Sequence, residues 1–308
     1  MSRETSVGGQ AVIEGVMMRG KKGVATAVRK PNGEIVVNKK DVVPYSKRNK
    51  ILGLPIIRGF VTLIESLIIG IETLNYSASF FEEDKDEEPS KLDKLFVKMF
   101  KEKSDDVLMG ITLCISIAIA ALLFFILPTF AANIFKKVGV HSSIGLNIIE
   151  GIIRVAIFLL YIYSIGKMED INRVFQYHGA EHKTIFCYEN EVELTPENVQ
   201  KFQRFHPRCG TNFLFLVMIV SIILFSLTGW SSLWQRILYR IILLPVVSGC
   251  TYELIRWIGK SESMLSKVIA YPGITLQQLT TKEPDTQQLE VAITALKHAE
   301  GIEETETL

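Results

Sequence analysis

The segment from Val107 to Phe130 contains no charged side chain. About 20 apolar residues are enough for a helix to cross the hydrocarbon core of a bilayer, so this segment is long enough to span one. Hydrophobic residues make up 48% of the 308-residue chain and the mean hydropathy is +0.26, which is too apolar for an ordinary soluble protein. The segment therefore predicts a membrane protein.

Three further apolar segments follow, at Ile144–Gly166, Asn212–Trp230 and Ile237–Gly259. Together with the first they predict a membrane α-helical bundle of about four transmembrane helices, occupying residues 107–259.

The distribution of lysine and arginine predicts the orientation of this bundle. The loops 136–143 and 230–236 are short and fall on one side, whereas segments 1–106, 167–211 and 260–308 fall on the other and are rich in basic residues near the membrane. The positive-inside rule places the longer segments in the cytosol. We expect a multi-pass protein of the bacterial cytoplasmic membrane with both termini cytosolic.

Residues 51–74 are apolar but carry Arg58, Glu65 and Glu72 at intervals of seven, which gives a helix one narrow polar stripe. A complete span here would carry the basic N-terminal region to the outer side, against the positive-inside rule. We therefore expect a re-entrant or interfacial helix packed against the bundle.

Two charged residues lie within the second predicted span. Glu150 and Arg154 are four positions apart, in the order that favours an ion pair on a helix. Because charges are costly in hydrocarbon, we expect them to pair with one another, or with Arg58 or Glu65. Either a functional membrane site or a neutral structural ion pair fits the pattern, and Arg240 in the last span is expected to snorkel outward.

The two ends of the chain predict one small α+β cytosolic domain. Residues 1–50 form a β-rich segment, with a hairpin turn at Asn32-Gly33. Residues 260–308 form a helical tail, which we expect to break at Tyr271-Pro272-Gly273 and to restart after Asp285 with an apolar face that packs on the N-terminal segment. Between the N-terminal region and the bundle, residues 75–106 contain an acidic linker and a predicted amphipathic surface helix.

The predicted cytosolic loop 167–211 contains a concentration of metal-binding residue types. His178 and His182 are one helical turn apart, so one face of a helix presents both imidazoles, and His206 and Cys209 follow after a polar loop. These four residues suit a divalent metal ion, with zinc as the first candidate. Cys187 and Glu189 are further candidate ligands.

The same residues can be explained without a metal, or by a metal in either of two roles. They are able to cap helix ends or to pair with Lys183, Arg204 and Arg208. If four of them close around a metal, the site is structural; if one position stays open, the ion would lower the pKa of a water molecule towards about 7 and Glu181 could act as a catalytic acid or base. The pattern leaves these alternatives open.

The N-terminal region is basic, which suits the lipid bilayer surface. Anionic lipids are the expected partners, with a membrane protein or the ribosome and translocon as further candidates, and no specific DNA binding is expected. The basic residues are Arg19, Lys21, Lys22, Arg29, Lys30, Lys39, Lys40, Lys47, Arg48 and Lys50.

Several motifs in one order give the chain a likeness to a known family. They are Gly8-Gly9-Gln10-Ala11-Val12-Ile13-Glu14-Gly15-Val16-Met17-Met18-Arg19, Ile57-Arg58-Gly59, His178-Gly179-Ala180-Glu181-His182-Lys183, His206-Pro207-Arg208-Cys209-Gly210-Thr211 and Glu283-Pro284-Asp285. Through them nearly the whole chain resembles the YqhQ family of bacterial membrane proteins, whose function is unknown. Members are often labelled predicted metal-dependent enzymes, so the resemblance implies a metal at His178, His182, His206 and Cys209.

Two functions therefore remain as hypotheses. The first is a metal-dependent hydrolase that acts at the membrane surface, with Glu181 as the catalytic residue. The second is a non-catalytic factor for membrane-protein biogenesis or assembly, which docks on the ribosome, the translocon or anionic lipid through its basic cytosolic surface.

Overall fold

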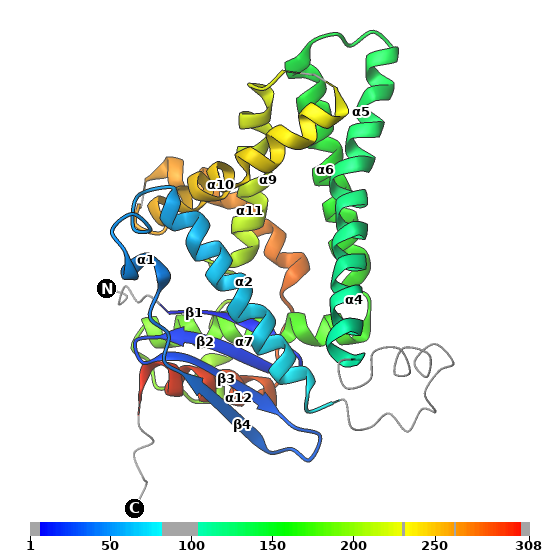
Figure 1. Cartoon of the computed structure of the whole chain (residues 1–308). Coiled ribbons are helices and arrows are strands. Elements are labelled where there is room, and N and C mark those ends of the chain that lie inside the picture. The colour runs from blue at the N-terminus through cyan, green and yellow to red at the C-terminus, as the bar shows by residue number, and fades with distance from the viewer. Residues whose placement is uncertain (1–6, 82–103, 230–231, 262, 303–308) are drawn as a thin grey trace, which may run out of the picture.

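A computed structural model describes residues 7–81, 104–229, 232–261 and 263–302 (Figure 1). The small N-terminal sheet predicted from the sequence is confirmed, as an antiparallel meander in the order β1-β2-β3-β4. Its strands are β1 Gly8–Val12, β2 Gly15–Gly20, β3 Gly23–Arg29 and β4 Ile35–Lys40. Gly33 lies in the β3–β4 turn with φ +89°, a conformation that glycine adopts without the steric cost of a Cβ atom.

The described part of the chain is otherwise mainly helical. Around the sheet lie α1 Tyr45–Arg48, α2 Ile57–Ala78, α7 Glu169–Glu189, α8 Pro196–Val199 and α12 Thr286–Glu300. The apolar part contains α4 Ser104–Ala121, the π-helical turn η2 Leu122–Ile126, α5 Leu127–Lys137, α6 Ser143–Ile165, α9 Gly210–Ser226, α10 Leu233–Ile258 and α11 Met264–Thr280.

Helices cover both faces of the sheet. Successive side chains of a strand point to opposite faces, so Val16 and Met18 on β2 enter a core with α7 and α12, while Met17 points the other way. On that second face, Thr26 lines a small cavity together with Ile69 of α2. Because both faces are covered, the central strands β2 and β3 are almost completely buried.

Helix α12 joins the end of the chain to the N-terminal sheet. Asp285 and Gln288 form a reciprocal capping box at its first turn, and Gly301 ends it in the left-handed conformation. Its apolar residues Leu289 and Leu296 are completely buried in the core that β2 and α7 share. Figure 1 shows α12 lying along the sheet.

Within the described residues, three helices are long and apolar enough to cross a membrane: Gly110–Lys137, Ser143–Ile165 and Trp234–Ile258. The prediction of about four spans is therefore supported for three. The fourth, Gly210–Ser226, is a shorter apolar helix, because the chain turns at Leu227. Large apolar side chains such as those of Phe130 and Leu160 are exposed on these helices, which is consistent with association with a membrane.

The first span extends further than the sequence predicted, from α4 through η2 to Lys137. Pro128 lies at the start of α5 and lacks a backbone N–H, so it would normally break or kink a helix. The preceding π-helical turn changes the local hydrogen-bond register, and the helix continues beyond Phe130. The turn also leaves the carbonyl oxygen of Phe124 to accept a hydrogen bond from Nε of Arg154, at 2.8 Å.

Helix α2 lies between the sheet and α10 and is not among the three candidate spans. Gly59 lies so close to Gly249 of α10 that a side chain at either position would clash with the other helix. The charged stripe of α2 is neutralised by partners on other elements. The ion pairs are Arg58 with Glu253, Glu65 with Arg19, and Glu72 with Lys40.

The charged residues of α6 form a buried ionic cluster. Oε1 of Glu150 lies 2.5 Å from a guanidinium nitrogen of Arg154 and 2.5 Å from one of Arg240, and Thr129 donates a hydrogen bond to the same oxygen at 3.1 Å. Arg236 approaches the other carboxylate oxygen at 3.9 Å. The expectation that Arg240 snorkels outward was wrong, because its guanidinium group has an anionic partner inside the bundle and is buried.

Two further expectations concern the linker and the tail. The predicted break at Tyr271-Pro272-Gly273 was wrong, since α11 continues through Pro272, and Gly273 packs against Asn212 where no side chain would fit. The acidic stretch 82–88 and the predicted amphipathic helix at 91–101 lie outside the described residues.

Candidate metal centre

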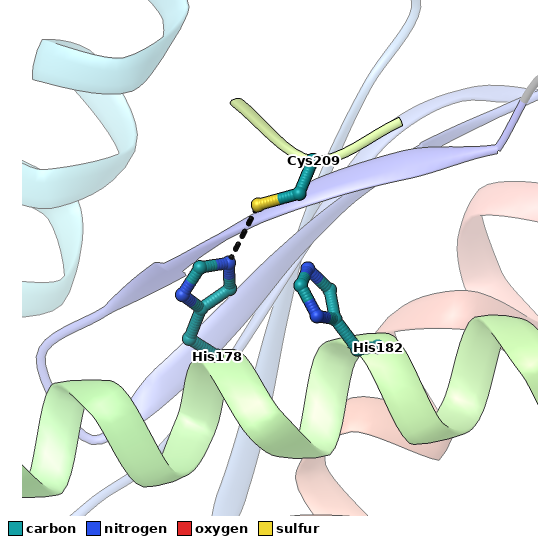
Figure 2. Close-up of side chains that lie close together, drawn as sticks. All are labelled: His178, His182 and Cys209. Carbon is teal, nitrogen blue, oxygen red and sulfur yellow. Dashed lines mark hydrogen bonds between the residues drawn. The ribbon is translucent and has the colours of Figure 1, made fainter. Parts of the chain in front are cut away.

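Helix α7 places His178 and His182 on one face, one turn apart, with their ring centroids separated by 4.4 Å (Figure 2). The opposite face of α7 contributes Ala180 and Cys187 to the core beneath the sheet. Packing of that apolar face fixes the rotation of the helix, so the two imidazoles point towards the loop that precedes α9.

That loop brings Cys209 to the two histidines. Cys209 is the N-cap residue of α9, and its sulfur accepts a hydrogen bond from the backbone N–H of Thr211 at 3.4 Å. Its Sγ lies 3.1 Å from Nε2 of His178. One ligand atom from each of His178, His182 and Cys209 lies within 4.8 Å of the others, as Figure 2 illustrates.

Backbone carbonyl groups orient both imidazoles. Nδ1 of His178 lies 2.8 Å from the carbonyl oxygen of Thr280, and Nδ1 of His182 lies 2.5 Å from that of Arg204. A carbonyl oxygen only accepts hydrogen bonds, so each Nδ1 carries a proton, and the tautomer with that one proton has its lone pair on Nε2. Histidines that bind metals in proteins are commonly held in this way by their second nitrogen.

The site contains a buried nitrogen that lacks a hydrogen-bond partner. Nε2 of His182 is inaccessible to solvent and makes no hydrogen bond. A buried polar atom without a partner is costly, and a metal ion held with Nε2 of His178 and Sγ of Cys209 would remove that cost. Two imidazole nitrogens and a thiolate form a donor set that zinc accepts, and three protein ligands leave one tetrahedral position open. The residues therefore fit a divalent metal ion.

His206, the predicted fourth ligand, lies beside this group but not in it. Its ring centroid is 5.7 Å from that of His182. The backbone N–H of Arg208 donates to Nδ1 of His206 at 3.3 Å, and Nε2 lies 3.6 Å from a carboxylate oxygen of Glu189. Both ring nitrogens thus face other groups, and burial lowers the pKa of the imidazole despite the neighbouring carboxylate.

Glu181 lies on α7 between the histidines and strand β1. Burial raises the pKa of its carboxyl group to about 7, against the opposing effects of nearby His178 and of a hydrogen bond from the backbone N–H of Gly9. Gly9 permits this close approach, because a Cβ atom there would lie 2.9 Å from Oε1 of Glu181. Oε2 is buried and makes no hydrogen bond.

The two additional candidate ligands have other surroundings. The thiol of Cys187 is buried and faces the carbonyl oxygens of Val192 and Glu193, and burial raises its pKa to about 11. Glu189 forms an ion pair with Arg208. Neither is in the group of three. Cys187 lies on the other side of the unbroken α7, whereas Glu189 lies on the same face as His182 but two turns further along the helix.

Residues far away in the sequence hold the site together. The side chain of Gln277 on α11 accepts a hydrogen bond from the backbone N–H of His206 and donates one to its carbonyl oxygen, both at 2.7 Å. Thr280, three residues later, supplies the carbonyl group that orients His178. Sequence reasoning missed both contributions, because no motif distinguishes a glutamine or a backbone carbonyl 71 or 102 residues from its partner.

Comparison with known proteins agrees with the resemblance found in the motifs. Residues 54–301 match the family described as "Protein of unknown function (DUF1385)". The chain is 35% identical, over 291 residues, to a Bacillus subtilis (strain 168) protein named "Uncharacterized protein YqhQ"; the match covers 93% of this chain and 89% of that protein. No solved structure matches. The chain therefore belongs to the DUF1385 family of proteins of unknown function.

Proposed function

We propose that this protein is a metal-dependent hydrolase that acts at the surface of the bacterial cytoplasmic membrane. The observation that carries the proposal is the convergence of His178, His182 and Cys209, with both imidazoles oriented by backbone carbonyl groups. Zinc is the first candidate, and three protein ligands with one open position are typical of catalytic zinc sites, whereas structural sites use four.

The metal, when bound, would act as a Lewis acid, which lowers the pKa of a water molecule and polarises an oxygen of the substrate. The surrounding residues orient the imidazoles and provide a candidate acid or base. Thr280 and Arg204 hold the two imidazoles in the tautomer that keeps Nε2 unprotonated. Glu181 is the candidate acid or base, since it is buried beside His178 and one of its oxygens has no hydrogen-bond partner.

The arrangement of the elements supports action at a membrane surface. In Figure 1 the sheet, α7 and α12 lie at one end of the molecule, while α5 and α6 extend away from it. The ligands come from α7 and from the loop before α9, between the sheet and the apolar helices. We place this end in the cytosol, with both termini, following the positive-inside rule.

A Glu181→Gln variant tests the proposed role of Glu181. Glutamine keeps the size of the side chain and an oxygen that accepts from Gly9, so metal content and melting temperature should match those of the wild type. Turnover of the ester and phosphoester substrates hydrolysed by the purified wild type should fall at least about 100-fold, the range for loss of a general acid or base. Full activity in this variant would contradict the assignment.

A second candidate uses the same residues without a metal. Sγ of Cys209 lies at the N-terminus of α9 and 3.1 Å from His178, an arrangement that favours a nucleophilic thiolate with histidine as its base. A dyad of this kind does not need Nε2 of His182. A His182→Gln variant distinguishes the two, because it should retain activity and labelling by iodoacetamide if Cys209 is a nucleophile, and lose metal and activity if the site is a metal centre.

The assembly-factor hypothesis receives less support, because many basic side chains of the N-terminal region are engaged within the chain. Five of them form ion pairs: Arg19 with Glu65, Lys21 with Glu300, Arg29 with Glu290, Lys30 with Glu34, and Lys40 with Glu72. We therefore favour the hydrolase hypothesis over the assembly-factor hypothesis.

A further inference from the structure

An open cavity of about 540 Å³ lies beside the candidate metal centre. It is bordered by the end of α7, the loop that contains His206, the end of α10 and the first half of α11. Three cationic side chains line it, those of Arg208, Lys260 and Lys267, against one carboxylate, that of Glu189. Arg208 pairs with Glu189, so the two exposed lysines leave the wall with a net positive charge.

Apolar side chains line the cavity as well. Ile258, Ala270 and Ile274 line it, and all three are buried or partly buried hydrophobic residues that pack together. A ligand for this cavity therefore combines an anionic group with an apolar part.

Helix α11 continues this apolar surface outward from Tyr271, which also lines the cavity. Met264, Val268 and Tyr271 are spaced by four and three positions and so share one face of the helix, and Leu265 adjoins them. Between 58% and 80% of each of these side chains is exposed. An exposed apolar face next to lysines is typical of a helix at the boundary between lipid headgroups and acyl chains.

The cavity and the metal centre share one wall. His206 lines the cavity, and its ring lies next to that of His182, with 5.7 Å between centroids. Phe186, which is one turn after His182 on α7, also lines the cavity and packs against His206 with 4.6 Å between centroids. A molecule bound in the cavity thus lies one side chain away from the metal ligands.

We propose that this cavity binds the phosphate-bearing headgroup of an anionic lipid beside the candidate metal centre. Lys260 and Lys267 neutralise the phosphate, while the acyl chains follow Ile258 and Ile274 to the exposed face of α11. The position also suits a lipid, because the cavity begins where α10, a candidate span, ends at Ile258.

Binding of three probes to the full-length detergent-purified protein tests this inference. Dioctanoyl phosphatidate carries both the phosphate and the acyl chains, dioctanoylglycerol lacks the phosphate, and inorganic phosphate lacks the chains. Microscale thermophoresis should show phosphatidate binding at least about tenfold more tightly than either of the others. Equal binding of dioctanoylglycerol overturns the proposed headgroup site, and equal binding of inorganic phosphate overturns its assignment to a lipid.

Two variants locate the binding. Lys260→Gln with Lys267→Gln should weaken phosphatidate binding roughly 30-fold, since each lysine near an anionic headgroup contributes about a factor of five. Gly259→Leu should block the cavity without straining the backbone, because residue 259 has φ −64° and its Cβ atom would meet Arg208 at an ordinary 3.5 Å. Lys136→Gln with Lys137→Gln removes the same charge from exposed positions at the end of α5, and should leave the affinity within about twofold.

The metal content of the same samples separates the two proposals. If phosphatidate binds a metal-free His182→Ala variant as tightly as the wild type, the cavity is confirmed independently of the metal. If the wild type contains metal but the lysine and glycine variants bind phosphatidate as it does, the lipid site is refuted while the metal centre stands.

Discussion

Replacement of Glu150 by glutamine should destabilise the protein severely. Its carboxylate is 1% exposed and is the one anion in direct contact with the guanidinium groups of Arg154 and Arg240 among the described residues, with Arg236 close by. Glutamine has nearly the same shape but no charge, so the variant keeps the packing and leaves Arg154 and Arg240 without their carboxylate partner.

The size of the effect follows from burial. Removing one partner from a buried, hydrogen-bonded ion pair typically costs about 3–5 kcal/mol, because the remaining charge is left uncompensated. For a chain of this size that corresponds to a fall in melting temperature of roughly 6–10 °C. The fall in melting temperature is measured by thermal unfolding of the detergent-purified protein, with intrinsic tryptophan fluorescence as the signal.

A double variant separates charge from shape. Glu150→Gln with Arg240→Gln restores the original net charge of the cluster, and we expect it to recover part of the lost melting temperature. The matched control is Glu34→Gln, which breaks an exposed i,i+4 pair with Lys30 and should shift the melting temperature by no more than about 1 °C. A Glu150→Gln variant as stable as this control would refute the argument that the cluster is a buried and charge-dependent contact.

The remaining predictions concern the packing around the metal centre. Gly179→Ala should cost about 1–3 kcal/mol, seen as a lower melting temperature, because its Cβ would clash with the carbonyl oxygen of Lys282. Gly145→Ala, whose Cβ would meet nothing closer than 3.6 Å, should not lower it. A fully stable Gly179→Ala variant would contradict the close approach. Gln277→Ala should leave the backbone N–H and carbonyl of His206 without their partner, and so weaken zinc binding about 10- to 100-fold in a competition titration with a chromogenic chelator. Unchanged zinc affinity would show that the loop is held by other contacts.

Local patterns in the sequence predicted the structural features that depend on neighbouring residues. The Asn32-Gly33 hairpin lies in a small antiparallel sheet, and the interval of four between His178 and His182 gives two imidazoles on one face of α7. Cys209 also joins them, although only its residue type and its place in a motif suggested this. For the hairpin and the histidine pair, the chain geometry over a few residues is sufficient.

Contacts that no pattern in the sequence indicates explain what was not predicted. Arg240 was expected to snorkel because the sequence does not indicate its anionic partner. That partner, Glu150, is on another helix 90 positions earlier, and no periodicity links the two residues. His206 was predicted as a ligand from its pairing with Cys209 in the sequence; it lies beside the group of three, and its ring nitrogens face the backbone N–H of Arg208 and the carboxylate of Glu189. Pro272 was read as a helix end, although packing of Gly273 against Asn212 keeps α11 continuous.

The most direct test of the metal centre is the metal content of the full-length purified protein, measured by elemental mass spectrometry after reconstitution with zinc. We predict about one ion per chain, and its loss in His178→Ala, His182→Ala and Cys209→Ser variants that remain folded. His298→Ala and Cys114→Ser, which alter an exposed histidine and an exposed cysteine elsewhere, should retain it. Absence of bound zinc, manganese or iron in the reconstituted wild type, or full metal content in all three ligand variants, would contradict the account.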